Sequence, residues 1–114
     1  MVKNINAQDL KELLKNRENL EMIDVREPSE YRIIHLKGSK LIPMNELEDR
    51  ANEIDWNKEV VFICRSGSRS GIMANFLARP DREIKNLRSG IYECFRDNEC
   101  PDLEILKDEI HMYF

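Results

Sequence analysis

The sequence lacks the features that would place the protein in a membrane or on nucleic acid. Its apolar runs are short, and none approaches the roughly 20 residues that a membrane-spanning helix needs. The opening stretch "MVKNINAQDL" has no apolar core or cleavage site of a secretory signal, so we expect the protein in the cytoplasm. The formal net charge of -4 argues against general attraction to nucleic acid or to an anionic membrane surface.

Cysteine and histidine are also scarce, with three cysteines and two histidines. In a reducing compartment, an odd set of cysteines predicts no structural disulfide. Cys94 and Cys100 lie close together in the sequence, but His35 and His111 give them no closely spaced partner. We therefore expect no metal site and no cofactor.

What the sequence does contain is an alternation of extended and helical segments. With 41% hydrophobic and 35% charged residues, the chain is expected to form one globular domain over residues 1–114. The alternation predicts an α/β fold with a mostly parallel sheet, in which the continuous apolar run 59–64 is a central strand. The expected helices cover residues 7–16, 28–32, 45–54 and 70–79, the extended segments 20–25, 39–43, 59–64 and 83–87, and two closing helices 91–97 and 101–114.

Capping residues and apolar spacing predict where these helices begin and which faces they bury. Asn6 and Asn45 are expected to cap helices, and Pro28 and Pro101 to open them. Apolar residues at helical spacing should point inward, namely Leu47, Ala51 and Ile54 in one helix and Ile72, Met73, Phe76 and Leu77 in another.

The stretch "VVFICRSGSRSGIMANFLARP", residues 60–80, carries the chemistry. Cys64 ends the predicted central strand, at the sheet edge where ligands of open α/β folds collect. Backbone N–H groups of the following loop and the first turn of the next helix can converge on its sulfur. Arg65 and Arg69 add positive charge, and Gly67 allows the loop to turn back. Together these features favour the thiolate and predict a nucleophile that meets an anion.

A plainer interpretation treats Cys64 as a small buried hydrophobe at a strand end. That interpretation does not explain two arginines and three serines within the next six residues. The serines themselves, Ser66, Ser68 and Ser70, are interpretable either as hydroxyl donors to the site or as simple turn and cap residues.

Four segments in order resemble the rhodanese-like sulfurtransferase family. They are "MIDVREPSEY", "HLKGSKLIP", "CRSGSRS" and "NLRSGIYECF", and the resemblance runs from about Asn4 to Arg96. It implies a three-layer α/β/α rhodanese-like domain with a mostly parallel central sheet of about five strands. Ile34, Leu41 and Ser89 depart from the family pattern at scaffold positions.

The resemblance also implies a reaction. Cys64 is expected to take a sulfane sulfur from a donor such as thiosulfate, to form a persulfide, and to pass the sulfur to cyanide, a thiol or a protein acceptor. The substrate-binding residues are then the loop Arg65, Ser66, Gly67, Ser68, Arg69 and Ser70. Asp24 and Arg26 are expected to support the loop through an ion pair or hydrogen bonds, in the same segment as Glu27.

Other residues have both a functional and a packing interpretation. His35 could be a general base, but a hydrogen-bonded packing residue is favoured because a thiolate needs no separate base. Cys94 and Cys100 could resolve a persulfide, but packing and turn positions are favoured. Tyr31 and Trp56 could line a substrate rim, although solitary aromatic residues usually anchor packing.

Two other functions compete with sulfur transfer. Related phosphatases use a loop cysteine and arginine separated by five residues, whereas four residues separate Cys64 from Arg69, which suits a sulfur atom better than a phosphoryl group. A sulfur carrier or a regulatory binding module could keep the fold without turnover, but regulatory binding modules commonly lack the cysteine that this chain keeps. The physiological donor and acceptor and the oligomeric state stay open.

Overall fold

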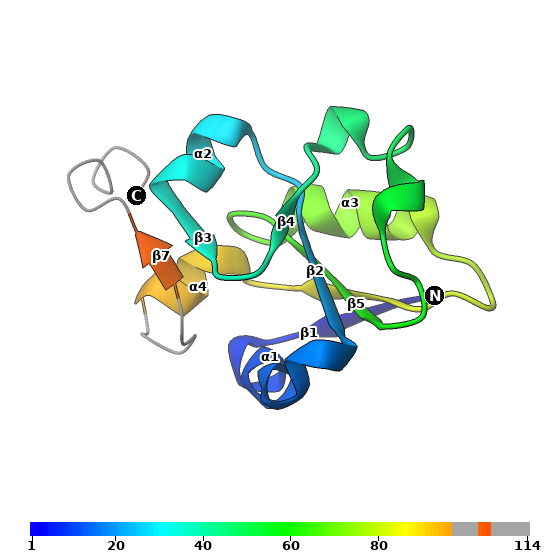
Figure 1. Cartoon of the computed structure of the whole chain (residues 1–114), viewed down its shortest axis with the longest axis horizontal. Coiled ribbons are helices and arrows are strands. Elements are labelled where there is room, and N and C mark those ends of the chain that lie inside the picture. Colours follow the sequence, from blue (N-terminus) through cyan, green and yellow to red (C-terminus); the bar gives the residue numbers. More distant parts are fainter. Residues whose placement is uncertain (97–102, 106–114) are drawn as a thin grey trace.

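The computed structural model, in which residues 1–96 and 103–105 are described, is built on a parallel sheet (Figure 1). The five strands lie in the order β1-β6-β5-β2-β4, and every pair of neighbours is parallel. The predicted α/β/α fold and the central place of residues 59–63 are confirmed. The strands are β1 Val2–Ile5, β2 Leu20–Asp24, β4 Lys40–Leu41, β5 Glu59–Ile63 and β6 Ile84–Leu87.

Helices connect these strands, and two of them begin where the capping residues predict. The Asn6 side chain accepts a hydrogen bond from the backbone N–H of Asp9, whose carboxylate accepts one from the Asn6 N–H in return. Pro28 occupies the first turn of its helix. The helices are α1 Ala7–Leu13, α2 Pro28–Ile33, α3 Ser68–Leu77 and α4 Gly90–Arg96, with 3-10 turns η1 Leu14–Asn19, η2 Met44–Glu46 and η3 Ala51–Glu53.

Strand β5 divides the core into two apolar layers. Val61 and Ile63 point into one layer, together with residues of α1 and α4. Val60 and Phe62 point into the other, together with Met73, Ala74 and Leu77 of α3. Figure 1 shows α3 above the strands and α1 below them. Because both faces of β5 are covered, its sequence is apolar at successive positions rather than at alternate ones.

Residues 45–54 do not form the single helix that the sequence predicts. The segment contains the short 3-10 turns η2 and η3 instead, and the cap position of η2 is Pro43 rather than Asn45. Leu47 and Ile54 are nevertheless buried, as expected. The Trp56 indole N–H donates to the carbonyl of Ala51, the first residue of η3, at 3.1 Å.

The buried face of α3 differs from the expected one. Ile72 and Phe76 are each 60% exposed, so the prediction that they face the core is wrong. The buried face consists of Ser70, Met73, Ala74 and Leu77. Its position follows from the loop after Cys64, because the Ser70 hydroxyl lies beside the sulfur of Cys64 and this contact fixes the rotation of the helix about its axis.

The prediction of a second closing helix is also wrong for the residues that the structure describes. Residues Leu103–Ile105 form β7, which pairs antiparallel with β3, Ile34–Leu36. The rest of the expected helix at 101–114, including Pro101 and His111, lies outside the described residues. Strands β1 and β3 have no counterpart among the expected elements.

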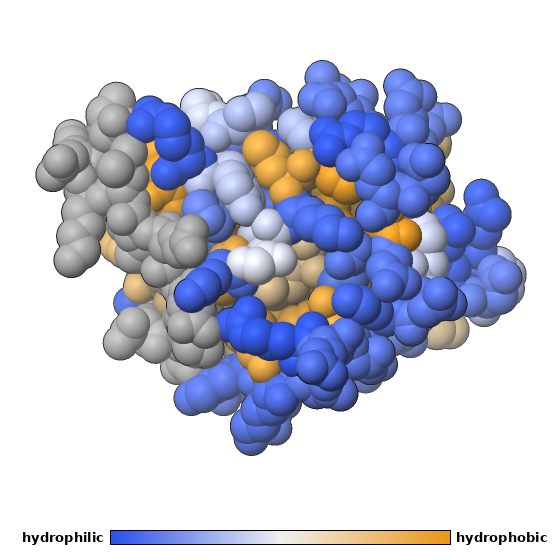
Figure 2. Space-filling model, in the orientation of Figure 1, coloured by the Kyte–Doolittle hydropathy of each residue, from blue (hydrophilic) through white to orange (hydrophobic). Residues whose placement is uncertain are grey.

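Hydrophilic residues cover most of the face of the molecule that Figure 2 presents, and apolar residues are visible in its recesses. Within the described part of the chain, every helix is too short or too polar to cross a membrane.

Candidate active site

Cys64 follows directly on β5, between the carboxyl ends of the neighbouring strands β2 and β6. It is 1% exposed, and it is the free cysteine of the described residues. The first residues of α4 form hydrogen bonds with the backbone of Cys64 and of the residue that follows it. The N–H of Ile91 donates to the carbonyl of Cys64, and the N–H of Tyr92 to the carbonyl of Arg65, each at 3.0 Å. The start of α4 thereby fixes the direction in which the loop leaves the strand.

Two groups of the loop and helix approach the sulfur. The backbone N–H of Gly67 donates to Sγ at 3.0 Å, and the hydroxyl of Ser70 lies 3.3 Å from it. The expectation that loop N–H groups turn toward the thiol is met at Gly67. An N–H donor stabilises a sulfur anion more than a neutral thiol, so the arrangement favours a nucleophilic cysteine.

Gly67 holds a position that no other residue can fill without distortion. Its φ is +92°, in the left-handed region, and it caps α3. A Cβ built on it would lie 1.8 Å from the carbonyl oxygen of Arg88. Gly90 is similarly confined, with φ +62° and a would-be Cβ 2.3 Å from the carbonyl oxygen of Arg65. The two glycines allow the loop and the start of α4 to pack backbone against backbone.

A buried amide, Asn86 of β6, connects the members of the site. Its Oδ1 accepts from the Ser70 hydroxyl at 2.5 Å, and its Nδ2 donates to the carbonyl of Gly67 at 3.2 Å. Nδ2 also donates to Oδ1 of Asn4 at 3.1 Å. Sequence reasoning missed Asn86. The segment "EIKNL" gives no clear signal for it, because Asn86 stands beside two other polar residues, Glu83 and Lys85.

Arg69 reaches α2. Its guanidinium donates to both carboxylate oxygens of Glu30, at 2.6 and 3.0 Å. Partial burial alone would raise the pKa of Glu30, but the hydrogen bonds from Arg69 and from the Glu27 backbone N–H outweigh it and hold that pKa below its usual value. Glu30 is the second member of the site that the sequence did not single out.

Arg65 contacts α4. It is half-buried, and its guanidinium carbon is 5.5 Å from the centre of the Tyr92 ring, a cation–π contact. Ser66 and Ser68 are exposed. The helix cap is Gly67, which has no side chain, so the three serines do not act as side-chain caps of α3.

The pair Asp24 and Arg26 is buried beneath the site. Both side chains are fully buried, and Arg26 donates to the two Asp24 carboxylate oxygens at 2.8 Å each and to the carbonyl of Ile34 at 2.5 Å. Between them, the Val25 N–H donates to the carbonyl of Ile63, the residue before Cys64. The ion pair expected from the sequence is therefore present beside the end of β5, where it can support the loop.

His35 and Tyr31 pack against each other. Their rings stack with centres 4.0 Å apart, and Nδ1 of His35 lies 2.7 Å from the carbonyl oxygen of Tyr31. The Tyr31 hydroxyl donates to the carbonyl of Ser39 at 2.7 Å. These contacts agree with the packing interpretation of both residues.

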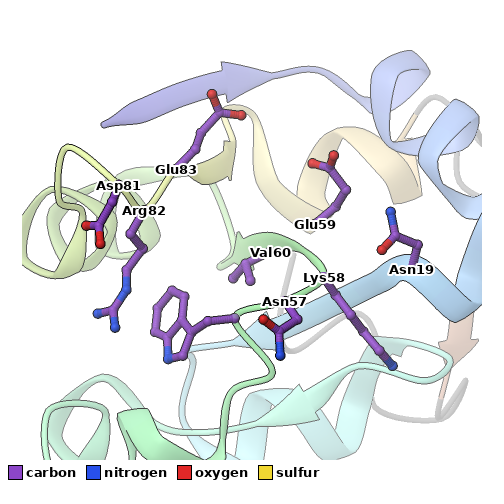
Figure 3. Close-up of a pocket in the computed structure, with 9 residues that line it drawn as sticks. Asn19, Asn57, Lys58, Glu59, Val60, Asp81, Arg82 and Glu83 are labelled. Carbon is purple, nitrogen blue, oxygen red and sulfur yellow. The ribbon is translucent and has the colours of Figure 1, made fainter.

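Trp56 comes before β5 in the chain and Cys64 comes directly after it. The two residues therefore lie at opposite ends of this strand. Arg82 lies over the Trp56 ring at 3.9 Å, beside a hollow of about 500 Å³. Figure 3 shows this hollow with Asp81 and Arg82 on one side and Asn57 and Lys58 on the other. The interpretation of Trp56 as a rim residue of the cysteine site is wrong, because the length of β5 separates the two.

The prediction of no structural disulfide is wrong for Cys94, which is buried and disulfide-bonded. Cys94 in this form has no thiol with which to resolve a persulfide. Cys100 lies outside the described residues. Among residues 1–96 and 103–105, no group of three or more His, Cys, Asp or Glu side chains is placed to hold a metal ion.

Comparisons of the sequence and of the structure with known proteins point to the same family. The "Rhodanese-like domain" family matches residues 6–96. The chain is 32% identical over 92 residues to a "Sulfurtransferase" of Allochromatium vinosum, covering 80% of this chain and 86% of that protein. A crystal structure of a rhodanese-related protein from Thermoplasma volcanium has a TM-score of 0.79 at 29% identity, covering 90% of this chain and 98% of that one.

A further relative is similar over a shorter stretch. The "Putative sulfur carrier protein YrkF" of Bacillus subtilis is 39% identical over 75 residues, which are 66% of this chain. The chain spans 40% of the length of that protein.

Proposed function

The chain belongs to the rhodanese-like domain family, and we propose that it is a sulfurtransferase that moves a sulfane sulfur through a persulfide on Cys64. The observation that carries the proposal is the hydrogen bond of 3.0 Å from the Gly67 N–H to Sγ, at the carboxyl end of the central parallel strand. The name of the Allochromatium vinosum relative supports the same class of reaction. We also propose that residues 1–114 form one domain, and that it acts in the cytoplasm.

The first step is an attack by the Cys64 thiolate on the outer sulfur of thiosulfate. A bond forms between Sγ and that sulfur, the S–S bond of thiosulfate breaks, and its electron pair leaves with sulfite. In the second step an acceptor, cyanide or a thiolate, attacks the outer sulfur of the persulfide. The Sγ–S bond breaks, the electron pair returns to Cys64 as thiolate, and the product is thiocyanate or a new persulfide. Neither step needs a cofactor or an external oxidant.

The loop supplies charge and hydrogen bonds for these steps. The Gly67 N–H holds negative charge on Sγ in the free thiolate and again when the sulfur leaves. Arg65, directly after the nucleophile, attracts the anionic donor and the departing sulfite. Arg69 braces the loop through Glu30, while Asp24 and Arg26 support the chain beneath it.

Loop length supports a sulfur atom as the group transferred, rather than a phosphoryl group. Four residues separate Cys64 from Arg69, and the guanidinium of Arg69 is paired with the carboxylate of Glu30. A phosphate cradle needs donors that converge on three oxygens.

A sulfur-carrier or regulatory binding module is the alternative function, and similarity to YrkF favours its carrier form. A carrier would accept sulfur on Cys64 but would release it to a specific protein rather than to small acceptors. An intact cysteine with an N–H donor on its sulfur supports sulfur chemistry over a purely regulatory role.

The test is the conversion of thiosulfate and cyanide to thiocyanate. We expect turnover by the protein and none by Cys64→Ser, with an unchanged circular dichroism spectrum. Stoichiometric loading without thiocyanate release would favour the carrier, and undiminished turnover by Cys64→Ser would remove Cys64 as the nucleophile.

A further inference from the structure

The orientation of the Asn86 amide is fixed by its surroundings. The side chain is buried, with 4% of the residue exposed. Its partner at 3.2 Å is the carbonyl oxygen of Gly67, which can only accept a hydrogen bond. The amide nitrogen must therefore face Gly67, and the amide oxygen must face Ser70.

This orientation decides where the Ser70 proton lies. A serine hydroxyl has one proton to donate. Its oxygen is 2.5 Å from Oδ1 of Asn86 and 3.3 Å from the sulfur of Cys64. Two oxygen atoms at 2.5 Å need a proton between them, and the amide oxygen has none to give. The proton of Ser70 therefore points to Asn86, and the two contacts of the hydroxyl compete for it.

We propose that Asn86 is a positioning residue that holds the Ser70 proton away from Cys64, so that Ser70 accepts the thiol proton instead of donating to the thiolate. The inference rests on the proposed function only in taking Cys64 as the reacting group. While the sulfur carries its proton, the hydrogen bonds run from Sγ–H to the Ser70 oxygen and from the Ser70 hydroxyl to Asn86. The Gly67 N–H remains as donor to the sulfur when the proton leaves.

Asn86 thereby acts on both neighbours of the sulfur. Through its oxygen it withholds the Ser70 proton, and through its nitrogen it holds the carbonyl of the residue that donates to Sγ. The first action favours the thiol and the second favours the thiolate. The two must be separated experimentally, because a single substitution of Asn86 removes both.

A double-mutant cycle separates them. The readout is the Cys64 thiolate fraction from ultraviolet absorbance across a pH series, with Cys64→Ser subtracted as the blank. The proteins are the parent, Ser70→Ala, Asn86→Ala and the double variant. In the parent background, we expect Ser70→Ala to leave the thiolate fraction unchanged or to raise it, because the substitution removes an acceptor of the thiol proton.

In the Asn86→Ala background the sign should reverse. There the freed hydroxyl donates to the thiolate, and its removal should lower the ionisation constant roughly tenfold, the size of one charge-assisted hydrogen bond. If Ser70→Ala lowers the thiolate fraction in the parent protein, Ser70 already donates to the sulfur and the proposal is overturned.

Asn86→Asp is the matched control. It changes the contact with Gly67 but keeps an oxygen acceptor for Ser70, so the effect of Ser70→Ala should retain its parent sign there. A reversal in Asn86→Asp as well would overturn the role of the acceptor. If Asn86→Ala does not fold, the effect of Ser70→Ala in the parent and Asn86→Asp backgrounds still tests the proposal. The titration needs no sulfur donor, so absence of sulfurtransferase activity would not alter its outcome.

Discussion

The guanidinium of Arg69 donates to both carboxylate oxygens of Glu30, at 2.6 and 3.0 Å, although the two residues lie 39 positions apart in the sequence. This ion pair ties the start of α3, and with it the cysteine loop, to α2. The side chains are 33% and 17% exposed, so solvent screens the pair only in part. Arg69 is therefore placed to hold the loop, and Arg65 is the residue that we propose to meet the donor.

Arg69→Ala should lower both stability and kcat. The loss of a partly buried, bidentate pair should reduce the free energy of unfolding by about 1 to 2 kcal/mol and kcat by roughly tenfold. Urea unfolding and steady-state kinetics measure the two effects. Arg79→Ala, an exposed arginine beyond the far end of α3, removes the same charge and should change neither. An Arg69→Ala protein with full stability and a raised KM would assign Arg69 to the substrate.

The contribution of the Arg69–Glu30 ion pair to the free energy of unfolding should fall as the pH is lowered. Because the folded-state pKa of Glu30 lies below its usual value of 4.5, its stabilising effect is complete above that value and is lost as the pH falls through the folded pKa. The stability difference between the parent and Glu30→Gln should therefore shrink on acidification. Urea unfolding at a series of pH values measures it, and a difference that grows toward acid would contradict the assignment.

Gly67→Ala should destabilise the protein far more than Gly38→Ala. Both glycines have positive φ, +92° and +86°, so both substitutions carry the left-handed strain of about 1 kcal/mol. Only at Gly67 does the new Cβ meet backbone, 1.8 Å from the Arg88 oxygen, whereas at Gly38 the nearest atom is a flexible arginine nitrogen at 3.6 Å. We expect a loss of about 3 kcal/mol or more at Gly67. Equal losses would show that close packing of the loop is unimportant.

Arg65→Ala should mainly raise the KM for thiosulfate. The substitution removes a contact made to the bound donor and to the transition state alike, so kcat should change little and KM should rise by roughly tenfold. Arg79→Ala again controls for net charge. An unchanged KM would mean that another group holds the donor.

The parts of the fold that were predictable from the sequence are those with local causes. Asn6 caps α1 with its own neighbours, and Pro28 opens α2 by fixing its backbone. The apolar run of β5 reflects burial on both faces. These signals need no knowledge of distant residues.

The predictions failed where contacts between residues far apart in the sequence determine the structure. The face of α3 follows from Ser70 meeting Cys64 and Asn86, which outweighs the apolar spacing of Ile72 and Phe76. Strand β7 exists only through its pairing with β3, some 70 residues earlier. Glu30 and Asn86 joined the site for the same reason, since their partners lie in other elements of the sheet and helices. Neither has a neighbour in sequence that signals its role.

The most direct test is the intact mass of the protein after incubation with thiosulfate. The account predicts a gain of one sulfur atom, located at Cys64, that disappears on addition of cyanide as thiocyanate forms. Cys64→Ser should gain nothing under the same conditions. A parent protein that gains no sulfur, or a Cys64→Ser protein that gains as much as the parent, would contradict sulfur transfer through Cys64.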